Sequence, residues 1–122
     1  MNFRFASGRQ FSIYNLRFFM SDLQKMREQA RKIRELYDNI EPKEWRVDQI
    51  FMGMVKDIGN LSKKLMVYEG YRDDAKNDIK ELEHELGDIL LSLFWIAGKL
   101  GIDLEKSFWR TAEELEKRLS NF

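Results

Sequence analysis

Apolar residues recur at steps of three and four along nearly the whole chain after residue 20, which is the period of an amphipathic helix. Breakers divide this pattern into four predicted helices, over about 21–40, 42–68, 74–100 and 104–119. The segment Ser21–Gln24 is a capping box, Pro42 suits the first turn of the second helix, and Asp103 is the expected N-cap of the fourth. Because short links make long helices antiparallel neighbours, we expect an all-α fold, an antiparallel helical bundle of about four helices.

Residues 1–19 differ in kind from the rest of the chain. They hold six aromatic residues and three arginines, with no acidic residue and no helical period. We therefore expect a non-helical aromatic N-terminal extension over 1–19 and one all-α domain over 20–122. Six aromatic side chains can bury much apolar surface, so a subunit interface is the favoured role of the extension. A lid over the site and incidental packing remain alternatives.

Composition and charge exclude several classes of function. A chain of 122 residues with 43% hydrophobic content builds one domain, and its 21 basic and 21 acidic residues cancel, so nucleic acid is not an expected partner. The longest apolar run, Ile89–Ala97, is far below the roughly 18 residues that a membrane span needs. The absence of cysteine excludes disulfides and thiolate zinc sites, and fits a cytoplasmic protein.

Two short motifs place oxygen-bearing side chains three residues apart, Asp57 with Asn60 and Glu85 with Asp88. That spacing aims both members of a pair from one flank of a helix. The two motifs lie symmetrically about the turn at 69–74, where Gly70 is the expected helix stop and Asp73 or Asp74 the next N-cap. We therefore expect Asp57 level with Asp88, and Asn60 level with Glu85.

Carboxylates crowded beside a core repel one another unless a cation intervenes. Asp57, Asn60, Glu85 and Asp88 are thus predicted ligands of Mg²⁺, with Mn²⁺ an acceptable substitute, because both are hard cations that oxygen atoms bind. Glycines at equivalent motif positions, Gly59 and Gly87, predict a close approach of the two helices. The alternative is that all four residues are ordinary solvated helix residues.

The stretch KELEHELGDIL at 80–90, followed by GIDLE at 101–105, resembles the second half of the signature of MazG-like nucleotide pyrophosphohydrolases. The resemblance covers about 21–119. It implies an ExxE motif and an ExxD motif that bind Mg²⁺, and hydrolysis of a nucleoside triphosphate to the monophosphate and pyrophosphate in nucleotide-pool housekeeping. Glu85 and Asp88 match the pattern. Asp57 and Asn60 replace its first two glutamates, and Lys56 stands where another acid is usual, so activity is expected to be reduced or altered.

The resemblance also implies roles for other residues. Asp57 or Glu85 is the expected base for the attacking water. Basic residues that are candidate phosphate ligands are Lys63, Lys64, Arg110 and Lys117. The family's lysine and asparagine in the last helix appear here as Thr111 and Leu115. Trp45 is a candidate for stacking on the base, with burial in the core favoured as its role. His84 falls on the far helix face and is not expected to be a base.

Bundles of this length often cannot bury every apolar face alone, so we expect a homodimer or homotetramer. Two other functions remain open. Asn60 and Lys56 favour a catalytically weakened family member that binds nucleotides or a partner, whereas the aromatic extension favours a helical oligomerisation module.

Overall fold

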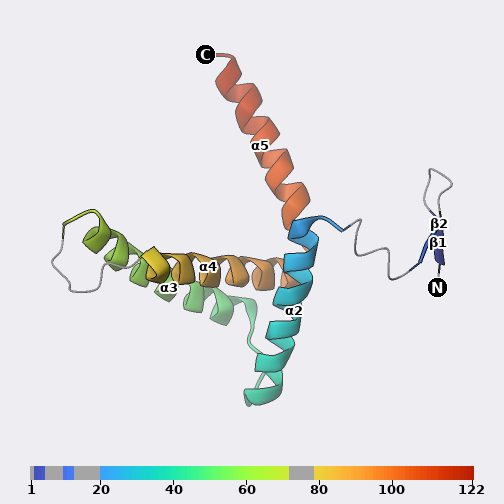
Figure 1. Cartoon of the computed structure of the whole chain (residues 1–122), viewed down its shortest axis with the longest axis horizontal. Helices are drawn as coiled ribbons and strands as arrows, with labels where there is room; N and C mark the ends of the chain where they lie inside the picture. Colours follow the sequence, from blue (N-terminus) through green and yellow to red (C-terminus); the bar gives the residue numbers. More distant parts are fainter. Residues whose placement is uncertain (1, 5–9, 13–19, 72–78) are drawn as a thin grey trace.

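The computed structural model describes residues 2–4, 10–12, 20–71 and 79–122. Four helices make up most of it, which confirms the predicted all-α class and helical bundle (Figure 1). They are α2 (Asp22–Ile40), α3 (Val47–Tyr68), α4 (Ile79–Leu100) and α5 (Leu104–Ser120). Two short strands in the predicted non-helical extension, β1 (Asn2–Arg4) and β2 (Gln10–Ser12), pair antiparallel with Phe3 opposite Phe11.

The helices begin largely where local chemistry predicts. Ser21 caps α2 through a complete capping box with Gln24, and Asp103 caps α5 by accepting a hydrogen bond from the Lys106 amide at 3.1 Å. The predicted start of the second helix at Pro42 is wrong, because α3 begins at Val47. The segment between α2 and α3 is instead tied to other helices, by the ion pairs of Glu41 with Arg34 and of Glu44 with Lys99.

Two helices end at glycines with left-handed backbone, as the sequence predicts. Gly70 has φ +82° and Gly101 has φ +69°, and the residue after each closes the helix with a hydrogen bond. The Tyr71 amide donates to the Met66 carbonyl at 2.8 Å, and the Ile102 amide donates to the Ala97 carbonyl at 2.9 Å, the bond that defines a Schellman end. The expected N-cap at Asp73 or Asp74 and the helix start near 74 lie outside the described residues.

The core is small and lies where α3 and α4 run antiparallel and α2 crosses the C-terminal half of α4 (Figure 1). Its buried apolar residues are Ala30, Ile50, Met54, Leu82, Phe94 and Ala97. The indole N–H of Trp95 on α4 donates to the Ala30 carbonyl on α2 at 2.7 Å, which fixes the crossing. The fourth helix, α5, extends away from the α3–α4 pair and buries none of its residues.

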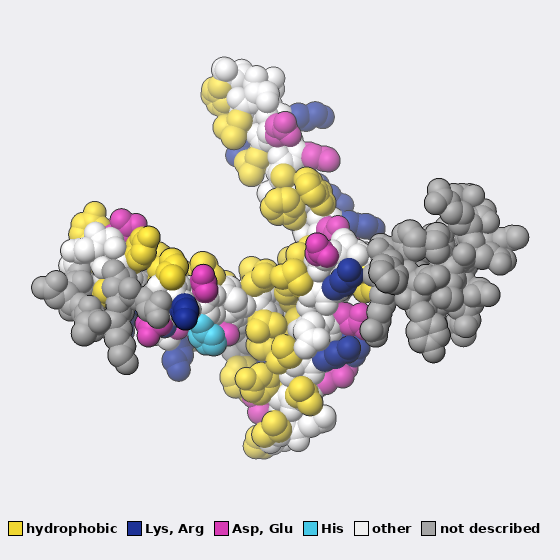
Figure 2. Space-filling view, viewed as in Figure 1, with side chains coloured by type: hydrophobic (Ala, Val, Ile, Leu, Met, Phe, Trp, Pro, Cys, Tyr) yellow, Lys and Arg dark blue, Asp and Glu magenta, His cyan; other side chains and the backbone are white. Residues whose placement is uncertain are grey.

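Large apolar side chains remain exposed along the outer faces of the helices. They form one row along α5 and another along the arm made by α3 and α4, and the two rows border the open angle between these elements (Figure 2). In the described residues, no helix combines the length and apolar character needed to cross a membrane.

Candidate metal centre

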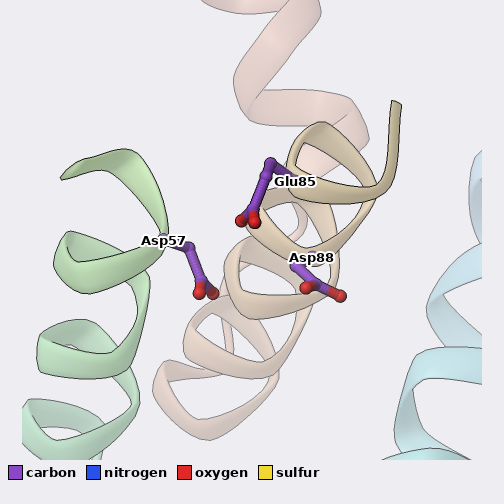
Figure 3. Close-up of side chains that lie close together, drawn as sticks. All are labelled: Asp57, Glu85 and Asp88. Carbon is purple, nitrogen blue, oxygen red and sulfur yellow. The ribbon is translucent and has the colours of Figure 1, made fainter. Parts of the chain in front are cut away.

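Three carboxylates from two helices converge beside the core. Asp57 projects from α3 toward Glu85 and Asp88 on α4, and one oxygen from each lies within 4.8 Å of the others (Figure 3). Glu85 and Asp88 share a flank of α4 because they are three residues apart, and the antiparallel pairing sets Asp57 opposite them. The cluster is only partly open to solvent, since Glu85 is 7% exposed and the two aspartates are half-buried.

The structure therefore brings Asp57 to both carboxylates of the second motif. Asn60 follows one turn later on α3 and is half-buried. Its role as a fourth ligand remains a prediction. The expected close approach at Gly59 and Gly87 is wrong, because a Cβ on either would meet nothing within 4 Å. Both glycines are exposed, so they do not lie between the packed faces of α3 and α4.

Electrostatics at the cluster favour a bound cation. Burial raises the pKa of Asp57, and the negative charges of Asp88 and Glu85 raise it further, against smaller opposing effects of Lys56 and His84. Three oxygens at this spacing offer the hard, anionic donor set that Mg²⁺ and Mn²⁺ take, and such an ion would remove the repulsion. The residues present thus fit a divalent cation.

One of the predicted phosphate ligands lies at the cluster. Lys64, on the α3 flank that carries Asp57, donates to Glu85 Oε1 at 2.7 Å, and this hydrogen bond raises the pKa of the Lys64 ammonium. Lys63 is exposed. Arg110 and Lys117 lie on α5, which points away from the α3–α4 pair, so a single chain does not bring them to the carboxylates.

His84 was expected on the far face of its helix, and its side chain is indeed exposed. Its Nε2 nevertheless lies 3.2 Å from Asp88 Oδ2. The spacing of four residues between them was the signal for this contact, because such pairs are neighbours on a helix surface. His84 is therefore a partner of a site carboxylate.

A groove of about 340 Å³ opens beside the carboxylates, and Asp57, Asp88 and Lys56 lie on its wall. Trp45 lines it and is 37% exposed, so the favoured burial of Trp45 in the core is wrong. Sequence reasoning missed Arg34, which also lines the groove. The aromatic rings whose centroids lie 5.2–5.5 Å from its guanidinium carbon are those of Tyr37, Trp45 and Trp95.

Arg34 is held rigidly in this position. It is 8% exposed, and its guanidinium donates from Nε to Asp38 at 3.0 Å and from Nη2 to Glu41 at 2.8 Å. Asp38 lies one helical turn after Arg34, and that spacing was visible in the sequence. The approach of Trp45 and Trp95 was not, because both come from other parts of the chain.

Antiparallel helices that present opposed carboxylates next to an aromatic groove define an all-α protein with a site suited to a cation and an aromatic ligand. A family model of the MazG nucleotide pyrophosphohydrolase domain matches residues 26–122. The chain belongs to this family. No curated protein and no solved structure matches it.

Proposed function

We propose that this protein is a Mg²⁺-dependent nucleoside triphosphate pyrophosphohydrolase that converts an NTP or dNTP to the monophosphate and pyrophosphate. The observation that carries the proposal is the convergence of Asp57, Glu85 and Asp88 within 4.8 Å in a chain of this family. These carboxylates, with Asn60, would hold the cation. When bound, Mg²⁺ polarises phosphate oxygens and neutralises their charge.

Asp57 is the better placed of the two candidate bases. It lines the groove, whereas Glu85 is already bonded to Lys64. In the proposed reaction Asp57 takes a proton from water, the water oxygen bonds to the α-phosphorus, and the bond from that phosphorus to the α,β-bridging oxygen breaks. Pyrophosphate leaves with both electrons of that bond.

The groove supplies a binding place for the base. Its volume of about 340 Å³ lies at the lower end of the range of small-ligand sites. Trp45 and Trp95 line it, and the Arg34 guanidinium packs against both rings. A base stacked in this groove would direct its phosphates toward Asp57 and Asp88, with Lys56 on the same wall.

The reaction is tested by measuring pyrophosphate release from ribo-, deoxyribo- and modified nucleoside triphosphates, with Mg²⁺ or Mn²⁺ and then with a chelator. We expect metal-dependent release of pyrophosphate and monophosphate, abolished in Asp88→Ala while helical content by circular dichroism is retained. Asp48→Ala, an exposed aspartate in the first turn of the same α3, is the matched control and should remain active. Turnover retained in Asp88→Ala would exclude the proposed site.

Asn60 and the Lys64–Glu85 bond support a second candidate, a family member that binds nucleotides without hydrolysing them. Both features reduce the negative charge available to a cation. Nucleotide binding without pyrophosphate release from any substrate, together with activity gained by Asn60→Glu, would establish this alternative.

We also propose that the chain works as a homodimer or homotetramer. The support is the pair of exposed apolar rows that border the angle between α5 and the α3–α4 arm (Figure 2). Exposed apolar patches of this kind mark association surfaces. Housekeeping of nucleotide pools would place the protein in the cytoplasm, with nucleoside triphosphates and its own copies as its partners.

A further inference from the structure

Lys64 brings a positive charge to the cluster of Asp57, Glu85 and Asp88. Its ammonium nitrogen lies 2.7 Å from Glu85 Oε1 and its side chain is partly exposed, whereas Glu85 is nearly buried. Seven residues separate Lys64 from Asp57, so both side chains leave the same flank of α3. The lysine thus reaches the cluster from its edge and can turn outward to solvent.

Lys64 neutralises the charge of the nearly buried Glu85. A nearly buried carboxylate without a partner is costly, and the ammonium removes that cost for Glu85 when no other cation is bound. The ammonium holds one oxygen of Glu85 in a hydrogen bond, and Glu85 is one of the three carboxylates that converge within 4.8 Å. A cation bound by all three must therefore compete with Lys64 for Glu85.

We propose that Lys64 is an internal counter-ion that competes with the divalent cation for Glu85 and, once displaced, binds the phosphates of the substrate. This rests on the proposed function, since it takes the three carboxylates to be the cation ligands. Lys64 then has two states. It stabilises the metal-free site, and in the loaded site its charge moves from the carboxylate to the anionic substrate.

Metal affinity without substrate tests the first half of the proposal. Mn²⁺ binding is measured by calorimetry and by electron paramagnetic resonance on the full chain and on Lys64→Met. Removal of a positive charge a few ångströms from the cation should tighten Mn²⁺ binding by about fivefold or more. Lys32→Met, at an exposed lysine on α2 outside the groove and the carboxylate cluster, is the control and should bind Mn²⁺ within about twofold of the original chain, because a distant solvated charge contributes little. Lys64→Arg retains the charge and should also resemble the original chain.

The same variants give a second readout through stability. Without metal, Lys64→Met leaves Glu85 unpaired, so the melting temperature of the variant should be lower than that of the original chain. Mn²⁺ should raise the melting temperature of the variant more than that of the original chain. If Lys64→Met does not fold alone, recovery of helical circular dichroism on adding Mn²⁺ supports the competition. A variant that stays unfolded at saturating Mn²⁺ contradicts it, as does Mn²⁺ affinity in Lys64→Met that is equal to or weaker than the original.

The second half concerns the substrate. With Mg²⁺ saturating, a triphosphate with a methylene group in place of the α,β-bridging oxygen should bind Lys64→Met several-fold more weakly than it binds the control Lys32→Met. Equal binding excludes transfer of the lysine to the phosphates. Because neither measurement uses turnover, these results are separable from failure of the proposed function, which would appear as metal and nucleotide binding without pyrophosphate release.

Discussion

Asn60 is the proposed fourth ligand, and its lack of charge would weaken the attraction of the site for a cation. It lies one turn after Asp57 on α3, and its side chain offers an oxygen without a negative charge. In the nearby cluster, one oxygen of Glu85 already accepts a hydrogen bond from Lys64. Cation affinity rises with the number of charged ligands. At the scale of single residues, the site therefore combines reduced negative charge with an internal positive one.

We expect Asn60→Glu to tighten Mg²⁺ binding by about tenfold and to raise turnover at limiting Mg²⁺, because it adds a charged ligand. The measurements are calorimetry with Mg²⁺ and pyrophosphate release across a Mg²⁺ titration. Asn60→Gln, with the same side-chain length as glutamate and no charge, is the control and should show neither gain. Equal affinities in the two variants would show that residue 60 does not face the cation.

Asp57 gives a second prediction, on pH. Its pKa is raised in the folded protein, so its ionisation costs folded stability as pH rises from the unfolded value near 3.8 through the folded value. Asp57→Asn should therefore stabilise the metal-free protein at pH 8, by less than about 1 kcal/mol because the site is partly solvated. The gain should shrink toward pH 4.

Urea unfolding at both pH values measures this effect. Asp48→Asn is the opposite control, because hydrogen bonding to Arg46 lowers the pKa of Asp48, and its replacement should not stabilise at pH 8. Adding Mg²⁺ should favour the original chain over Asp57→Asn, since the variant loses a ligand. A gain that persists unchanged in Mg²⁺ would mean that the ion binds elsewhere.

At the scale of elements, the helix ends carry distinct backbone demands. Gly101 has positive φ and ends α4, whereas Gly98 lies within α4, where a Cβ would meet nothing within 4 Å. Gly101→Ala should destabilise the protein by about 1–2 kcal/mol, and Gly98→Ala should stabilise it by roughly 0.5 kcal/mol. Urea unfolding at one fixed protein concentration compares them. If both variants changed the free energy of unfolding in the same direction, α4 would not end at Gly101.

Local rules predicted the helices well, because periodicity, capping boxes and stop glycines act within a few residues. The capping box at Ser21 and the stops at Gly70 and Gly101 are confirmed. Pro42 misled because its fixed φ suits a helix start, whereas ion pairs of its neighbours Glu41 and Glu44 with other helices hold this stretch outside α3.

The meeting of Asp57 with Glu85 and Asp88 was predictable, because the two motifs lie symmetrically about one turn. Contacts between segments that are distant in the sequence were not predictable. Arg34 meets Trp45 and Trp95 only because α2 crosses α4, and periodicity does not give crossing geometry. The choice of Lys64 over Lys63 as the partner of Glu85 depended on side-chain reach across the helix pair.

For the whole molecule, the main feature is how little α5 packs against the other helices of the described part of the chain. Its apolar row follows a helical period yet none of its residues is buried. The row consists of Leu104, Phe108, Ala112, Leu115 and Leu119. On α4, Leu86, Leu93 and Leu100 repeat every seven residues and are also exposed. A second copy of the chain would cover both rows, which is the physical basis of the proposed dimer or tetramer.

Phe108→Glu should reduce the mass in solution to that of the monomer, because it places a charge in the apolar row of α5. Light scattering after gel filtration measures the mass. Arg110→Glu introduces the same residue on the opposite face of α5 and should leave the assembly intact, which also tests whether Arg110 contributes to turnover. An unchanged mass for Phe108→Glu would remove α5 from the interface.

The positions of the three tryptophans have a practical consequence for optical work. Trp45 and Trp95 border the groove beside the carboxylates, whereas Trp109 lies on α5 in edge contact with Phe108. Nucleotide binding and subunit association should therefore change the emission of different tryptophans. A nucleotide entering the groove should quench the indoles at 45 and 95, and dilution that separates the subunits should red-shift the indole at 109. Single tryptophan-to-phenylalanine variants would turn one fluorescence titration into separate readings of occupancy and of association.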